Sequence, residues 1–318
     1  MKKRGIAVKT SSLLHRAGVR VPTNEDQWKN GPEYTFNASL GMVTSMEVDK
    51  GQPMGSNMFV TLKCRPKEPT RLHCRFENAR IAKFVPEKFE AEASMPPANA
   101  TFSDFGFGNA SFEILFNEDG IENYKFENDD RQMGDYLVNM YRLIANHLSV
   151  GVKFRKDVPS PLRKLENSSV GECNVTYNVS RRKLDQPISI EEFQLVWLPD
   201  QRIDPEQETE ITRETHLSDC LIHSVYFFGT RHTFGIVPVG SMEKLQSSTG
   251  RIIISSSNFT SESTNKVDVY NTKRKMIGSV LDHIRLTLVS VTPLTSDFKE
   301  ITNPMNIGPI LNKSSIDY

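Results

Sequence analysis

The stretch from Asp130 to Ser149, DRQMGDYLVNMYRLIANHLS, decides the fold because it is the only long segment with the periodicity of a helix. Asp129 or Asp130 can cap its start, and Gly151 lies just past its end. The rest of the chain alternates at period two or breaks into turns. We therefore expect strands that wrap or cover this helix; an ordinary core helix on one sheet face is the alternative. The apolar stripe consists of Met133, Leu137, Met140, Tyr141, Ile144 and Leu148.

The composition limits the class of protein. The 318 residues suffice for one large β domain or two smaller ones. Thirty-nine basic and 39 acidic residues cancel, which argues against a dedicated nucleic-acid surface. Two short basic runs, at 181–183 and 273–275, are contact points or plain solvated loops. No run of eighteen apolar residues occurs, so we expect no membrane span.

Several features favour an extracellular protein, although no signal peptide is visible. The basic start at 1–4 is not followed by the apolar stretch that a signal peptide needs. The four cysteines could close two bridges. A secreted protein whose true start lies elsewhere is the prediction, and a cytosolic protein with chance sequons is the alternative. Eight Asn-x-Ser/Thr sequons occur, against roughly three or four expected by chance, at Asn37, Asn99, Asn109, Asn167, Asn174, Asn178, Asn258 and Asn312.

Two cysteine-bearing segments read as strands. Residues 58–64 and 72–76 alternate around a proline-bearing turn and predict a hairpin. Cys64 and Cys74 each share the face of their strand's apolar residues, so a bridge between them is geometrically reasonable; two buried free thiols are the alternative. In 173–179, Asn174 and Asn178 alternate with apolar residues, which predicts that both sequons point to solvent.

The chain shows no catalytic signature. It lacks a GxSxG elbow, HExxH, CxxC and a Walker loop, so we expect no enzyme and no cofactor. The segment 216–223, with His216, Cys220 and His223, is the only metal-like cluster. Its spacing does not suit zinc, and a disulfide through Cys220 is favoured over a metal site.

Four separated motifs carry a family resemblance. They are WKNGPEYTF at 28–36, the hairpin and helix SFEILFNEDGIENYKFENDDRQMGDYLVNMYRLIANHLSV at 111–150, NSSVGECNVTYNV at 167–179 and IRLTLVSVTP at 284–293. Together and in this order they resemble the amino-terminal β-barrel of the large lipid transfer proteins, and most closely insect-type vitellogenins. Each motif alone is weakly specific, but their order is fairly specific.

The resemblance implies a mostly β fold, an antiparallel β-barrel wrapped around one central helix at about 130–149, similar to the lipovitellin N-sheet. It also implies secretion and a disulfide between Cys173 and Cys220. We expect a disordered or misannotated tail at 1–26, the barrel at 27–293, and a polar tail at 294–318 that leads toward an absent helical domain. The family's signal peptide, polyserine linker and lipid-holding sheets are not seen in this chain.

The resemblance further implies a parent function of lipid transport and yolk nutrient storage. A small barrel around a helix is filled by side chains, so lipids would bind through the complete parent protein. This segment would then supply interdomain packing and recognition by a lipoprotein-receptor-type cell-surface receptor. A free-standing secreted binding module without lipid cargo is the alternative, and a lipoprotein-assembly or clotting relative is another.

Overall fold

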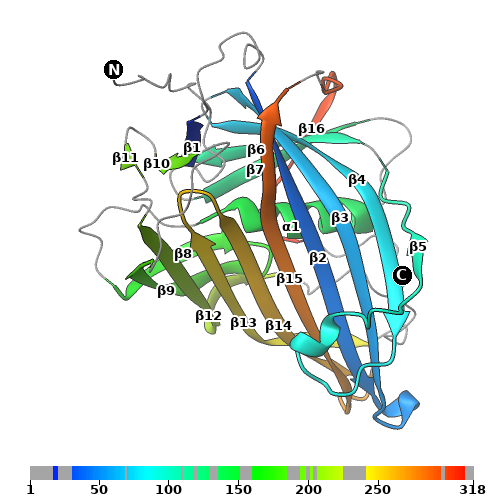
Figure 1. Cartoon of the computed structure of the whole chain (residues 1–318). Coiled ribbons are helices and arrows are strands. Elements are labelled where there is room, and N and C mark those ends of the chain that lie inside the picture. Colours follow the sequence, from blue (N-terminus) through cyan, green and yellow to red (C-terminus); the bar gives the residue numbers. More distant parts are fainter. Residues whose placement is uncertain are drawn as a thin grey trace, which may run out of the picture.

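The protein is built mainly from one large antiparallel sheet that curves around a short helix (Figure 1). The computed structural model describes residues 17–20, 31–68, 70–108, 110–117, 120–128, 135–150, 160–184, 194–197, 201–202, 206–224, 241–294 and 298–311. From one edge to the other, the sheet contains β16 (Pro304–Ile307), β7 (Gly120–Glu127), β6 (Ser111–Asn117), β4 (Arg71–Phe84), β3 (Pro53–Glu68), β2 (Pro32–Met46), β15 (Met276–Pro293), β14 (Phe259–Tyr270), β13 (Met242–Ile254), β12 (Gln207–His223), β9 (Gly171–Lys183) and β8 (Leu162–Ser168).

The remaining elements are short. Strand β5 (Phe102–Asp104) pairs with β4, and a separate three-stranded sheet consists of β1 (Ala17–Arg20), β10 (Gln194–Trp197) and β11 (Gln201–Arg202). Strand β1 thus lies within the predicted tail at 1–26. The helical elements are α1 (Asp135–Ala145) and the 3-10 turns η1 (Glu47–Asp49), η2 (Glu92–Ser94) and η3 (Asn146–Leu148). No helix in the described part of the chain is both long and apolar enough to cross a membrane.

The prediction of a closed barrel is wrong. The described part of the sheet is open, with β16 at one edge and β8 at the other. Closure would require the two edge strands, β16 and β8, to pair, and these two strands do not pair among the described residues. One side of β7 pairs with β6, and residues 124–127 of β7 pair with β16 on the other side. Mostly β structure, antiparallel pairing and a central helix are confirmed.

The predicted helix is present within the described residues. Helix α1 covers 11 residues, and η3 continues it by one tighter turn to Leu148. The expected caps at 129–130 and Gly151 lie outside the described residues. Tyr141, Ile144 and Leu148 are fully buried, because the apolar stripe faces the inner side of the sheet.

Strand alternation sorts side chains between the inner and outer faces of the sheet. The predicted hairpin is β3–β4, and its register places Cys64 opposite Cys74. The alternation predicted for 173–179 is confirmed, since Cys173, Val175 and Tyr177 are buried whereas Asn178 is exposed. The inner face therefore forms the core with the helix.

Residues 298–311 cross the edge of the sheet, although the sequence placed them in a polar tail. Phe298 is buried on the outer face, where Arg75 lies 4.4 Å from its ring centroid. Strand β16 then pairs with β7. The segment ends inside, where Leu311 joins the core and the Gly308 carbonyl accepts a 2.7 Å hydrogen bond from Arg142.

Candidate functional site

Aromatic side chains fill the inner face of the sheet on one side of α1. Tyr141 lies 4.5 Å from the Phe76 ring and 5.2 Å from the Phe112 ring, measured between centroids. Its hydroxyl donates a 2.6 Å hydrogen bond to the Phe107 carbonyl. These large rings are all essentially buried, so they leave no room for a bulky ligand beside the helix.

The other half of the inner face is polar. His147 of η3 lies between the hydroxyls of Ser261 and Ser263 on β14, each 3.2 Å from a ring nitrogen. Burial lowers the pKa of His147 to about 3, with Arg213 contributing in the same direction. The neutral imidazole can donate to one serine and accept from the other. Among the described residues, a cavity of about 20 Å³ adjoins this cluster, which fixes the helix end to β14.

A buried carboxylate completes this polar half. Glu166 of β8 accepts a hydrogen bond from the hydroxyl of Tyr177 on β9. Burial raises the pKa of Glu166, which favours its neutral form. Nearby, Asp282 accepts a 2.9 Å hydrogen bond from Asn265. Sequence reasoning missed these groups because each stands alone within an ordinary strand pattern.

One group of potential metal ligands lies on the outer face. Ligand atoms of His73, Glu113 and Glu300 lie within 4.8 Å of one another. The Lys67 ammonium, however, lies 2.6 Å from Glu113 and also contacts Glu300, and Arg65 lies 2.8 Å from Glu300. The hydrogen bond from Lys67 holds the pKa of Glu300 below its usual value. Side-chain cations therefore balance these acids, and the group acts as an ion-pair cluster that holds residues 298–311.

The metal-like segment at 216–223 does not assemble a site. Cys220 forms a disulfide with Cys173, so its sulfur is not a thiolate ligand. His216 points to the Thr176 hydroxyl, 2.7 Å from its Nε2 atom. The second disulfide joins Cys64 to Cys74 across the β3–β4 pair. Both bridges thus link neighbouring strands.

One recess on the described surface lies on the outer face, between the sheet and the loop that contains η2. We call it the outer hollow; its volume is about 710 Å³. Asn57 fixes the loop by donating a 2.9 Å hydrogen bond to the Ser94 carbonyl, and Gly41 lies directly beneath Ser94. The polar and large apolar lining residues are Asn37, Ser39, Phe59, Thr61, Asn78, Arg80, Glu92, Met95, His283, Arg285 and Thr287.

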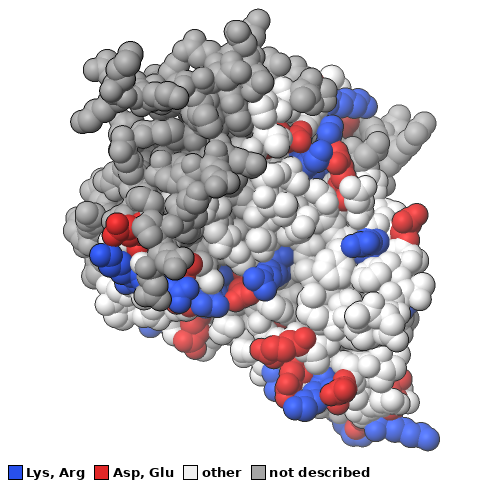
Figure 2. All heavy atoms as spheres, in the orientation of Figure 1, with Lys and Arg blue, Asp and Glu red and all other residues white. Residues whose placement is uncertain are grey.

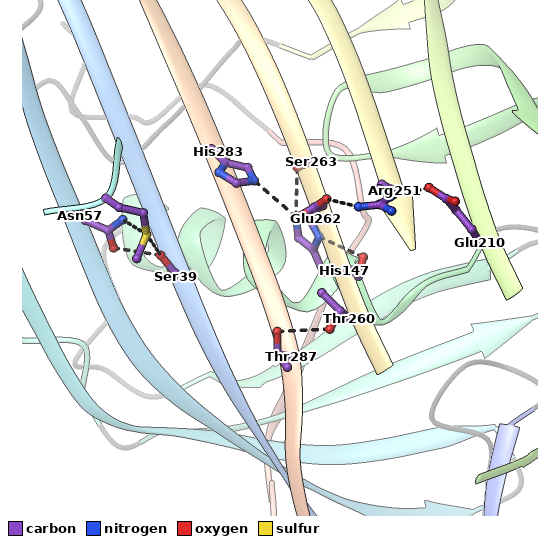
Figure 3. A network of polar contacts seen from close by, with 12 residues as sticks. Ser39, Asn57, His147, Glu210, Arg251, Thr260, Glu262, Ser263, His283 and Thr287 are labelled. Atoms are coloured by element: carbon purple, nitrogen blue, oxygen red, sulfur yellow. Dashed lines mark hydrogen bonds and ion pairs between the residues drawn. The ribbon is translucent and has the colours of Figure 1, made fainter. Parts of the chain in front are cut away.

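A row of charged side chains crosses four strands and ends at the outer hollow (Figure 3). Arg251 of β13 lies 2.5 Å from Glu210 on β12 and 3.7 Å from Glu262 on β14. His283 of β15 lies 3.8 Å from the other oxygen of Glu262 and lowers the pKa of that carboxyl. Of this row, only His283 lines the hollow.

The hollow itself carries unbalanced positive charge. The Arg80 guanidinium stacks 6.0 Å from the Phe59 ring centroid and 5.0 Å from the Phe102 centroid. Arg285 adds a second guanidinium, and Glu92 is the only acid among the described lining residues. Guanidinium, amide and aromatic groups suit recognition of a carboxylate-bearing partner, and no nucleophile with an adjacent base lines the hollow.

The described sequons are on the surface. Asn37, Asn99, Asn167 and Asn178 are exposed, whereas Asn174 and Asn258 are partly buried. Asn109 and Asn312 lie outside the described residues. Asn37 is the sequon that lines the outer hollow. Sequence reasoning found this asparagine but missed the hollow around it, because the lining comes from strands that are distant in sequence.

Comparisons with known proteins agree with this architecture. A sequence model described as the vitellogenin N-terminal domain matches residues 28–296. A solved chain described as lipid-protein interactions in lipovitellin is similar in fold, with a TM-score of 0.57 and 12% identity. The match covers 90% of this chain and 28% of that chain. No curated protein gives a significant match.

Proposed function

The chain belongs to the vitellogenin N-terminal domain family, and we propose that it supplies recognition and interdomain packing to a lipid-transporting lipoprotein. The family expected from the sequence motifs is thereby confirmed. For the complete particle we propose lipid transport and yolk nutrient storage. Lipid is the proposed cargo of the parent protein, and a lipoprotein-receptor-type cell-surface receptor is the proposed partner.

The filled inner face of the sheet is the observation that supports assigning recognition to this chain and lipid binding to other parts of the particle. The aromatic cluster at Tyr141 and the polar cluster at His147 occupy it, and the cavity beside them measures about 20 Å³. Ligand pockets for drug-sized molecules need roughly 300–1,000 Å³, so a lipid does not fit there. The cargo would therefore bind in other parts of the particle.

The outer hollow supports docking of a protein partner. Arg80 and Arg285 supply positive charge beside the aromatic face of Phe59. Such a site favours an acidic segment of a receptor, because a guanidinium binds a carboxylate with two parallel hydrogen bonds. A glycan on Asn37 would compete for this space, so docking requires that asparagine to be unmodified.

Secretion and glycosylation belong to the same proposal. The chain has two disulfides and exposed sequons, and both features are common in proteins that fold in oxidising compartments. We propose N-glycans at Asn99, Asn167 and Asn178, whose side chains point away from the core. Glycosidase treatment followed by peptide mass spectrometry would locate them.

An immunoblot of extracellular fluid and eggs with an antibody against this chain tests the parent function. We expect a band several times larger than 36.1 kDa that co-purifies with lipid and shifts on glycosidase treatment. A glycosylated band near that mass, without lipid or a larger precursor, would contradict lipid carriage. It would instead support the free-standing binding module.

Binding to the receptor ectodomain tests the outer hollow. We expect Arg80→Glu with Arg285→Glu to weaken binding by at least about 10-fold, since truncating close charge pairs at interfaces costs roughly 2 kcal/mol or more. The control is Arg181→Glu with Lys183→Glu, two reversals of charge on β9. Equal loss in both variants would contradict docking at the hollow.

A further inference from the structure

One end of the sheet gathers several chain reversals. Six strands lie side by side in the sheet, in the order β13, β14, β15, β2, β3 and β4. Their register places one end of each strand at the same edge of the molecule. Figure 1 shows the β2–β3 turn at this lower end. We call it the turn end, formed by residues 46–54, 83–89, 242, 266 and 270–277.

The turn end exposes large apolar side chains. Of the eleven exposed large hydrophobic residues in the described chain, five lie here. They come from four of the segments that form the turn end, so no single amphipathic strand explains them. Isolated apolar residues on a surface are ordinary, but a group at one end marks an interaction site. The exposed fractions are 72% for Val48, 58% for Val85, 47% for Met242, 44% for Met276 and 37% for Met54.

A wide hollow of about 830 Å³ opens at the same end. Met46, Phe89 and Met276 contribute apolar wall, whereas Lys50 and Lys266 lie at its lining with their side chains exposed. Apolar walls beside flexible ammonium groups suit an amphiphile, because the lysines can reach phosphate while acyl chains contact the methionines.

The charge of the turn end favours an anionic partner. Lys275 is ion-paired with Glu47 at 2.9 Å. Four other basic residues have no acid within ion-pair distance among the described residues: Lys50, Lys266, Lys273 and Arg274.

The β14–β15 turn presents its basic run in a fixed conformation, since the Asn271 side chain accepts hydrogen bonds from the Lys273 and Lys275 amides. Figure 2 shows Lys and Arg side chains, together with acids, at the lower end of the molecule.

We propose that the turn end docks on a phospholipid surface that contains anionic headgroups. Val48, Met276 and their apolar neighbours enter the boundary between headgroups and acyl chains, and the four unpaired basic residues contact phosphates. The proposed role in lipid transport places such a surface near this chain. Docking at the turn end is separate from partner binding at the outer hollow, on another part of the sheet.

Vesicle co-sedimentation of the full oxidised chain tests this inference. Phosphatidylcholine vesicles are compared with vesicles that also contain phosphatidylserine. We expect binding to the anionic vesicles, and about 30-fold weaker binding for Lys273→Gln with Arg274→Gln, because each basic residue near an anionic surface contributes about 1 kcal/mol. Val48→Asp should weaken binding further, as it places a charge in the boundary region.

Matched controls distinguish lipid docking from general effects. Arg181→Gln with Lys183→Gln removes two charges at the opposite end of the sheet, and Val289→Asp alters a residue that is 53% exposed on β15. Both controls should bind like the unchanged chain. Failure of the unchanged chain to bind, or equal binding by all variants, would overturn the inference and leave the receptor-binding test unaffected. Sedimentation equilibrium should show a monomer; a dimer lost in Val48→Asp would assign the turn end to self-association instead.

Discussion

Acidification should destabilise the protein through His147, because folding holds this imidazole in its neutral form. The pKa of His147 is about 3 in the folded protein, against an ordinary value of 6.5, chiefly because of burial and then the positive charge of Arg213. The unfolded chain therefore binds a proton at a pH where the folded chain does not. The stability contributed by neutral His147 is complete above about pH 6.5 and is lost as the pH falls toward about 3.

The expected magnitude follows from these two pKa values. Between about pH 7.5 and 5.0, one such group lowers the free energy of unfolding by about 2 kcal/mol. His147→Gln removes the titration while its amide can still bond Ser261 and Ser263. We expect the variant to lose about 2 kcal/mol less stability than the unchanged protein over this pH range.

Urea unfolding followed by circular dichroism at both pH values, with the disulfides intact, measures this difference. His73, with a pKa lowered to about 4 chiefly by burial, and Glu166, with a pKa raised by burial, also titrate. Both are present in the two proteins, so their contributions cancel in the comparison. Equal losses of stability in the variant and the unchanged protein would refute the assignment of a buried neutral His147.

Three further predictions concern stability. Cys173→Ala with Cys220→Ala opens a loop whose ends are 47 residues apart and should cost about 4 kcal/mol in the chain-entropy account, measured by urea unfolding. Gly41→Ala should loosen the η2 loop and speed its proteolysis, because a Cβ would overlap Ser94, whereas Gly106→Ala has open space and should behave like the unchanged protein. Phe298→Ala should cost about 3 kcal/mol and increase amide exchange in 298–311, since the ring is buried against Arg75; unchanged exchange would contradict the anchoring role of Phe298.

Local patterns in the sequence predicted the elements that depend on local spacing. The three- and four-residue spacing around Tyr141 predicted the helix, and period-two alternation predicted the β3–β4 hairpin and the buried face of 173–179. These predictions succeed because the periods of helices and strands are properties of the backbone itself. The family likewise follows from motifs within continuous segments.

Local sequence patterns could not predict whether the sheet closes into a barrel. The difference between a closed barrel and an open sheet depends on whether the edge strands β16 and β8 pair, and they do not pair among the described residues. The segment of β16, PMNI at 304–307, is only four residues long, so no periodicity marks it as a strand. Only the folded chain shows that this segment occupies the remaining edge of β7.

The sequence by itself determined the helix, the strand alternation, the exposed position of Asn178 and the family. The tertiary structure decided the open sheet, the His147 cluster, the outer hollow and the turn end. Each of these joins residues from strands far apart in the chain, such as Arg80 with Arg285 or Val48 with Met276. Strand order and register bring these residues together. Long-range hydrogen bonding and core packing determine the order and register, and local spacing does not.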